Sequence, residues 1–303
     1  MTSAPYVGDL LSLRTADGQQ WTLPDGERYA LVYGGFGAPP TTFITNTQYR
    51  ADAAVERGLM YETTELTVLF HQKTTSNRAT YWRQRAALID VLRWNRGGPL
   101  VLTLQREDGT RRAIEVYADP GATLPARDPS DDIWLIEESL SFIALRPVWY
   151  NPDATTVAGV LDVSGGLTFP ITFPITFGGG ARYNMPLQGY GGTYDSFPVI
   201  TVNGPYNSIA FSSNAVAASF KMDVPIQAGE QRIINLNPQN RTILDSAGVN
   251  CIGDLADGFD LVHFKIVPAP YDPGSGQTMT ALVKGRSNAT AVSMTFNEQF
   301  IGI

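Results

Sequence analysis

One cysteine and two histidines occur among the 303 residues of this chain. Because Cys251 is alone, the sequence excludes a disulfide framework within the chain and a metal cage built from several thiolates. No run approaches the roughly 18 apolar residues that a membrane-spanning helix needs. The N-terminus also lacks the basic start and apolar core of a secretory signal. These absences argue against a disulfide-stapled scaffold and against a helical membrane protein.

Clustered basic residues are scarce as well. Lys and Arg number 15 against 18 Asp and Glu in residues 1–150, and 7 against 11 in residues 151–303, so the halves carry -3 and -4. A protein that grips a duplex needs grouped Lys and Arg, and only Arg111 and Arg112 are adjacent here. An acidic surface repels phosphate. The charge balance therefore suits a surface that DNA passes and does not suit one that holds it.

The composition, with 29 Gly, 20 Pro and 11% aromatics, predicts a mainly β protein with many turns. One helix is expected at about 79–94, where Trp82, Ala86, Ile89 and Leu92 recur at three- and four-residue steps. This apolar stripe is expected to cover a sheet. Gly and Pro residues at 97–99 end the helix.

Short strands are predicted on both sides of this helix. The runs 10–13 and 20–23 flank a turn, 65–70 precedes the helix, and 100–104 and 112–117 form a hairpin around Asp108-Gly109. A long strand is expected from Ile133 to Leu145. Residues 41–60 are polar and weakly patterned, which fits an extended arm or an ordinary loop.

Two prolines near Trp149 mark a border, and the pattern changes beyond it. We therefore predict an N-terminal β-sandwich with one flanking helix over residues 1–150, followed by an antiparallel β-sandwich over 151–303, with a linker at about 146–178. In the second half, strands are expected at 197–202, 208–211, 220–224, 231–236, 261–267, 278–283 and 291–296. A Phe-Pro-Ile-Thr repeat at 167–177 predicts an edge strand or connector.

Catalytic signals are weak. His71 is expected to open a loop after a strand, and His263 to lie in an alternating strand, and neither accompanies a nucleophile elbow or a zinc helix. Glu137-Glu138 points to opposite faces of a strand, so the pair makes no glycosidase site. Asp254, Asp257 and Asp260 lack the ligand order of a calcium loop. We expect no enzyme activity, no cofactor and no metal.

Two sets of residues are candidates for binding. Arg83, Arg85, Asp90 and Arg93 lie off the apolar stripe, and Asp90 interrupts the arginines, so a solvated or inter-subunit face is favoured over phosphate contact. Tyrosines in Gly- and Asn-rich segments could stack on sugar rings, or could instead cap the sandwich or meet partner subunits. These tyrosines are Tyr183, Tyr190, Tyr194 and Tyr206.

The order of these elements resembles the distal tail protein family of long-tailed bacteriophages (siphophages). No single motif is specific, and the resemblance rests on order and spacing over nearly the whole chain. One departure is the longer loop at 267–276, where many relatives have a Pro-Gly-Asn turn. The similar segments are the N-terminal hairpin, 34–39, 79–94, 98–100, 145–150, 197–204, 228–230, 236–241, 249–250 and 300–303.

The resemblance implies a hexameric ring at the distal end of the virion tail, with a lumen for DNA. The implied partners are further copies of the chain, the tail tube protein, and the hub or tip protein. It also implies a galectin-like or carbohydrate-module-like second domain that carries a receptor-binding protein or binds a host glycan, and synthesis in the bacterial cytoplasm. The alternative is a stand-alone carbohydrate- or receptor-binding virion protein that acts in adsorption. A cell-wall hydrolase ranks third.

Overall fold

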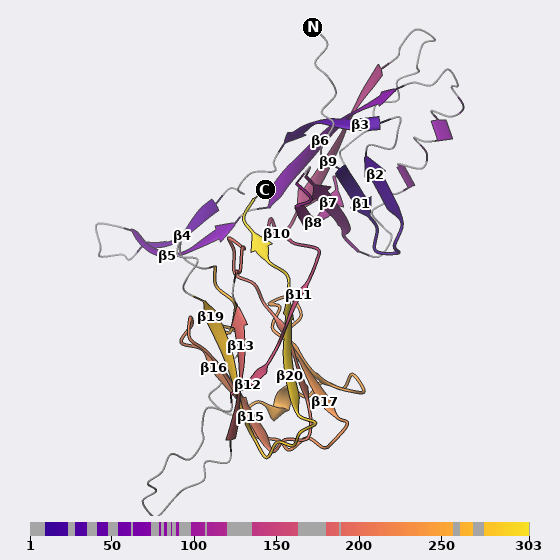
Figure 1. Cartoon of the computed structure of the whole chain (residues 1–303). Helices are drawn as coiled ribbons and strands as arrows, with labels where there is room; N and C mark the ends of the chain where they lie inside the picture. Colours follow the sequence, from indigo (N-terminus) through magenta and orange to yellow (C-terminus); the bar gives the residue numbers. More distant parts are fainter. Residues whose placement is uncertain are drawn as a thin grey trace, which may run out of the picture. The chain divides into compact units, whose positions relative to one another are not determined.

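A computed structural model gives the fold of the chain, and its strands form two separate groups (Figure 1). The residues that the structure describes are 10–23, 28–34, 41–47, 54–61, 63–73, 79, 82–83, 86, 89–90, 98–106, 108–119, 135–162, 180–187, 189–256, 261–268 and 276–302. The mainly β fold class predicted from the sequence is confirmed. No helix among the described residues is long and apolar enough to cross a bilayer.

The chain divides into two compact units. Unit 1 comprises residues 1–152 together with 300–303, and unit 2 comprises residues 153–299. The chain thus enters unit 2 at the proline-rich border expected from the sequence, but its last four residues belong to unit 1. Unit 2 is an insertion near the C-terminal end of unit 1.

Unit 1 is built on one nine-stranded sheet with the order β2-β1-β7-β8-β9-β6-β3, and β10 joins it through β8 and β21. The bounds of its strands are β1 (Leu10–Arg14), β2 (Gln20–Leu23), β3 (Arg28–Gly34), β6 (Thr64–Lys73), β7 (Leu100–Gln105), β8 (Arg111–Ala118), β9 (Leu135–Ala144), β10 (Trp149–Tyr150) and β21 (Gln299–Phe300). All the pairs with a described register are antiparallel.

Strand β8 connects the two halves of this sheet. Its residues 111–116 pair with β7, and Tyr117 and Ala118 pair with Ile143 and Phe142 of β9. Side chains on a strand alternate between faces, so Ile114, Val116 and Ala118 share the inner face. The apolar core contains side chains from β1, β6, β7, β8, β9, β10 and β21.

Local chemistry explains the two predicted hairpins of unit 1. Gly18 and Gly109 have φ angles of 89° and 83°, a conformation that glycine adopts without a steric penalty. The carboxylate of Asp108 accepts a hydrogen bond of 2.8 Å from the Thr110 amide, which fixes the second turn. The β1–β2 and β7–β8 pairs form at the predicted positions.

Strands β4 (Thr41–Thr47) and β5 (Ala54–Tyr61) form a separate two-stranded sheet. They pair with each other and, within the described part of the chain, with no other strand. The sequence allowed an arm or a loop at 41–60, and the structure has a hairpin there. A two-stranded hairpin is marginally stable in water by itself.

Unit 2 contains two five-stranded antiparallel sheets, ordered β11-β20-β14-β17-β18 and β12-β13-β19-β15-β16. A short 3-10 helix, η1 (Ile252–Asp254), follows β18. The strand bounds are β11 (Thr155–Ala158), β12 (Val160–Asp162), β13 (Gly180–Leu187), β14 (Val199–Asn203), β15 (Ser208–Ser213), β16 (Ser219–Met222), β17 (Gln231–Asn235), β18 (Thr242–Asp245), β19 (Gln277–Lys284) and β20 (Ala291–Phe296).

Each sheet of unit 2 contributes cross-strand rows of apolar side chains to a shared core. In the first sheet, Ile200 of β14 lies opposite Ile234 on one side and Met294 on the other, and all three are fully buried. In the second sheet, the rings of Phe211 and Phe220 stack at 4.7 Å between centroids. Cross-strand pairs of this kind stabilise antiparallel sheets.

The strand predicted at 261–267 does not form. Residues 261–263 are a bend, and Ile266 forms an isolated bridge with Ser196 in place of a strand ladder. The segment is also held by the ion pair of Lys265 with Asp195 and by hydrogen bonds to the side chain of Gln277. Alternate burial is kept only at Phe264 and Ile266, whereas Leu261 is buried three positions before Phe264. Burial of these side chains requires a suitable path for the backbone, and does not require a ladder partner. The Phe-Pro-Ile-Thr repeat at 167–177 lies outside the described residues.

Gly204 offers a test of the packing in unit 2. A β-carbon at this buried position would contact the carbonyl oxygen of Gln227 and would lie 2.9 Å from Cγ2 of Ile226. We expect Gly204→Ala to lower the free energy of unfolding by about 1–3 kcal/mol, because the backbone must shift. The measurement is urea unfolding of the full chain.

Gly253→Ala is the matched control for this variant. Nothing lies within 4 Å of the β-carbon position at Gly253. Its free energy of unfolding should stay within about 0.5 kcal/mol of that of the parent protein. Equal midpoints for the two variants would contradict the close approach at Gly204.

Candidate functional site

The predicted helix contributes an exposed surface to unit 1. Residues 79, 82–83, 86 and 89–90 are α-helical, in agreement with the helix predicted at 79–94, whereas Arg85 and Arg93 lie outside the described residues. Trp82 is 37% exposed and Ile89 is 45% exposed. Ala86 is also exposed. These three side chains are therefore outside the apolar core of unit 1, and the covering of a sheet by the stripe stays a prediction.

The helical period explains the composition of this surface. Trp82 and Ile89 are seven residues apart, about two turns, so they project from the same side of the helix. Arg83 and Asp90 have the same spacing and lie on the adjacent side; Arg83 is exposed and Asp90 is half-buried. We call Trp82, Arg83, Ala86, Ile89 and Asp90 the helical surface. Tryptophan and arginine are enriched at the energetic centres of protein interfaces.

Two of the four candidate tyrosines belong to the core of unit 2. Tyr183 in β13 is 5% exposed, and its hydroxyl donates a hydrogen bond of 3.0 Å to the carbonyl oxygen of Thr290. Tyr206 is 1% exposed, and its hydroxyl has no hydrogen-bond partner among the described residues. Burial raises the pKa of Tyr206 above its ordinary value. Neither ring can stack on a sugar in this structure, which corrects the prediction for these two residues.

Tyr190 and Tyr194 organise a loop beside the end of β20. The hydroxyl of Tyr190 donates to the carbonyl oxygen of Tyr194 at 2.7 Å and accepts from the Gln299 amide at 3.3 Å. Burial is the main cause that raises the pKa of Tyr190 to about 12. The ring of Tyr190 also lies 5.9 Å from the ring of Phe296. Tyr190 thus has a structural role, and Tyr194 is half-buried.

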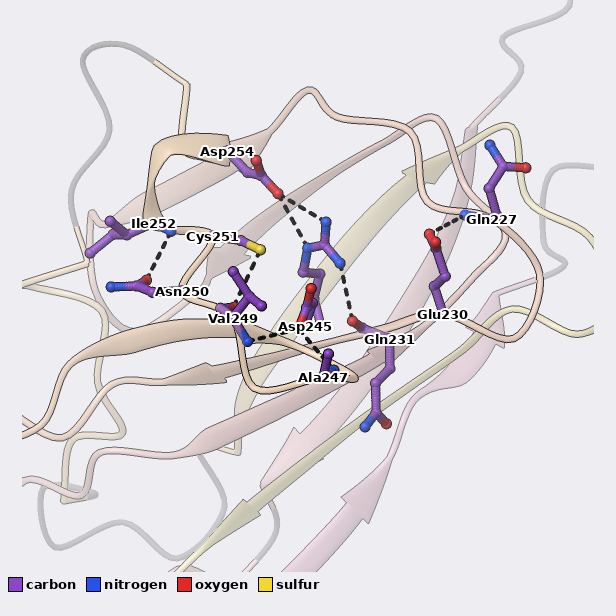
Figure 2. A network of polar contacts seen from close by, with 11 residues as sticks. Gln227, Glu230, Gln231, Asp245, Ala247, Val249, Asn250, Cys251, Ile252 and Asp254 are labelled. Carbon is purple, nitrogen blue, oxygen red and sulfur yellow. Dashed lines mark hydrogen bonds and ion pairs between the residues drawn. The ribbon is translucent and has the colours of Figure 1, made fainter.

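A polar network that the sequence did not predict includes Asp254, Asp245 and Glu230 (Figure 2). Asp254 forms an ion pair with Arg232 of β17. The Nε and Nη2 atoms of Arg232 each lie 3.2 Å from Oδ2 of Asp254. Its Nη1 donates to the carbonyl oxygen of Gln231 at 3.3 Å. The side chains of Arg232 and Asp254 are only 12% and 22% exposed, so this is a largely desolvated ion pair. It joins β17 to η1.

Neighbouring polar side chains in this network fix turns (Figure 2). Asp245 Oδ1 accepts hydrogen bonds of 2.8 Å from the amides of Ala247 and Val249. Asn250 Oδ1 accepts from the Ile252 amide at 3.1 Å. Glu230 Oε2 accepts from the Gln227 amide at 2.9 Å. The carboxylates shown here are thus engaged by a guanidinium or by backbone amides.

Other sequence candidates do not come together into a site. His71 lies within β6, not after it, and is paired in register with Glu137 of β9. His263 is exposed in the bend that replaces the predicted strand. Asp257 and Asp260 lie outside the described residues. Among the described residues, no group of three or more His, Cys, Asp or Glu side chains is arranged to hold a metal ion.

Comparison with known proteins identifies a solved structure with the same fold. No protein-family model matches the chain, and no curated protein matches it in sequence. The two-unit β fold is that of a solved phage protein. The Dit (gp 19.1) protein of SPP1, described as a paradigm of the hub adsorption apparatus in phages that infect Gram-positive bacteria, superposes with a TM-score of 0.60. The match has 13% sequence identity and covers 96% of this chain and 99% of that chain.

Two structures of the phage P2 baseplate in its activated conformation, with Ca and with Sr, are also similar. Their TM-scores are 0.49 and 0.47, at 9% identity, and each match covers 95% of this chain and 97% of that chain. These scores are too low to support an argument. The conclusion from the comparisons is that this chain shares the fold of the SPP1 protein over nearly its full length.

Two tyrosine hydroxyls in unit 2 make a matched pair for a test. Tyr183→Phe should lower the free energy of unfolding by about 1 kcal/mol, because the buried Thr290 carbonyl loses its donor. Tyr206→Phe removes a hydroxyl that has no described partner, so stability should be unchanged or higher. Urea unfolding of both variants measures the difference. A larger loss for Tyr206→Phe than for Tyr183→Phe would contradict the described hydrogen bonding.

The Arg232–Asp254 pair can be tested against an exposed pair in the same unit. Asp254→Asn keeps the shape of the side chain but leaves the desolvated guanidinium without its counter-charge, so we expect a loss on the order of 2 kcal/mol. Lys221 and Asp223 form the control pair, with side chains 34% and 50% exposed. Asp223→Asn should cost under about 1 kcal/mol. Equal losses in thermal or urea unfolding would show that burial of the first pair is not important.

Proposed function

We propose that this protein is a structural subunit of a phage tail, positioned at the distal end between the tail tube and the host-recognition apparatus. The observation that carries the proposal is the shared fold with the SPP1 Dit protein across both units, at a TM-score of 0.60. A match to one unit alone would support only a shared domain. A match over 96% of one chain and 99% of the other supports a common architecture.

Self-association into a six-membered ring is part of the proposal. The helical surface is the contact with a second copy, because it places exposed Trp82 and Ile89 beside Arg83 and Asp90. Desolvation of the two apolar side chains would supply affinity, and the neighbouring charges would set the register. Arg85 and Arg93 belong to the same proposed contact. A head-to-tail contact repeated around an axis closes into a ring.

The β4–β5 hairpin provides a second contact in this proposal. It has no strand partner among the described residues outside itself. A hairpin of this kind gains stability when it packs against another surface. We propose that it reaches the adjacent copy in the ring, so that each subunit both gives and receives an arm.

Unit 2 is a platform in the proposed assembly. Its two five-stranded sheets suit the galectin-like or carbohydrate-module-like role that the sequence resemblance implies, in which it carries a receptor-binding protein. Sugar binding through Tyr183 and Tyr206 is not part of the proposal, because both rings are buried. Catalysis is not part of it either. The acidic chain, with a net charge of -7, would let DNA pass the lumen of the ring without holding it.

Mass photometry of the purified chain tests the ring directly. Six chains of 33.0 kDa should give a species of about 200 kDa, with six-fold views in electron micrographs. Trp82→Glu should abolish this species and leave a folded monomer, because a charge in a desolvated contact is costly and the side chain is already exposed in the monomer. Ile89→Glu should have the same effect.

Val160→Glu is the control for these variants. Val160 is 63% exposed and lies on β12 of unit 2, outside the proposed contact, so its ring population should match that of the parent protein. A parent protein that stays monomeric at micromolar concentration and fails to join tail neighbours would refute the proposed function. Rings that persist in Trp82→Glu and Ile89→Glu would refute the assignment of the helical surface.

A further inference from the structure

The two ends of unit 1 are separated by the whole of unit 2. The chain leaves unit 1 after Pro152 and returns to it at Phe300. Strand β21, which contains Phe300, pairs with β10, and β10 in turn pairs with β8 through Tyr150 and Ala113. Three residues before the C-terminus, the chain thus supplies a piece of a sheet that otherwise consists of residues from the first half of the sequence.

Phe300 fills a place in the core of unit 1. It is 6% exposed and belongs to the same apolar cluster as Trp149 of β10 and Ile114 of β8. Burial of an aromatic side chain is among the largest single apolar contributions to stability. Because Phe300 follows unit 2 in the sequence, this contribution is absent until unit 2 has been synthesised.

Arg112 shows why this place needs an aromatic ring. Arg112 alternates with Ile114 and Val116, so it lies on the same face of β8, and its side chain is half-buried. Its guanidinium carbon lies 3.6 Å from the centroid of the Phe300 ring. A cation over an aromatic face is stabilised by the ring quadrupole. Phe300 therefore covers the core and also provides a favourable environment for the charge at its margin.

The residue before Phe300 is fixed within unit 2. The carbonyl oxygen of Gln299 accepts hydrogen bonds of 2.8 Å and 3.0 Å from the amides of Thr193 and Tyr194. Its amide donates to the hydroxyl of Tyr190 at 3.3 Å. The backbone at Gln299, directly before Phe300, is thus held by three hydrogen bonds within unit 2.

We infer that Phe300 completes the apolar core of unit 1, and that unit 1 can assemble only after all of unit 2 has been synthesised. A nascent chain that has not reached Phe300 lacks one aromatic side chain of the apolar cluster that contains Trp149 and Ile114. Each subunit that enters a ring would then carry a finished unit 2. The part about assembly rests on the proposed function, whereas the completion of unit 1 does not.

Hydrogen exchange of the full-length protein, read by mass spectrometry, tests the completion step. In Phe300→Ala, amides of β8 and β10 should exchange about tenfold faster or more, because local opening becomes easier, while β14 and β19 of unit 2 keep their protection. Phe300→Leu retains apolar bulk but loses the ring, so it should lie between Phe300→Ala and the parent protein. In mass photometry, the ring population should fall in the same order.

Ile301→Ala is the matched control, since this neighbouring residue is half-buried and outside the core cluster. Its exchange and its ring population should match those of the parent protein. Unchanged protection of β8 and β10 in Phe300→Ala would overturn the inference, and so would equal loss of protection in both units for both Phe300 variants. A parent protein that forms no rings would remove the proposed function, but the exchange comparison would still decide whether Phe300 completes unit 1.

Discussion

Strand β8 connects the two halves of the sheet in unit 1, because it pairs with β7, β9 and β10. Its inner face carries Ile114 and Val116 into the core and ends at Arg112. The half-buried guanidinium at this end lies over the ring of Phe300. The sheet of unit 1 thus depends on a contact between Arg112 and Phe300, which are 188 positions apart in the sequence.

Charged side chains in unit 2 are used to hold turns and ends of strands. Arg232 and Asp254 join β17 to η1, and Asp245 and Glu230 accept hydrogen bonds from backbone amides. These groups stabilise turns of unit 2. In the proposed platform, each such turn would reduce the conformational freedom of the surface that a partner meets.

The exposure of the helical surface calls for another interpretation of the apolar stripe in the sequence. Apolar residues at three- and four-residue steps identify one side of a helix, and they do not say what covers that side. Trp82 and Ile89 are exposed in the single chain. In our proposal the covering surface is a second copy, so the pattern that predicts a core in a monomer here predicts a contact in an assembly.

Local chemistry in the sequence determined the turns at Gly18 and Gly109, the hairpins they close, and most strands of both units. The sequence also indicated the border near Trp149. Only the tertiary structure decided that Tyr183 and Tyr206 are buried, that residues 261–263 bend, and that Phe300 returns to unit 1. The physical reason is the separation in sequence between interacting residues. Turns and alternation depend on neighbours along the chain, whereas burial depends on contacts with distant residues.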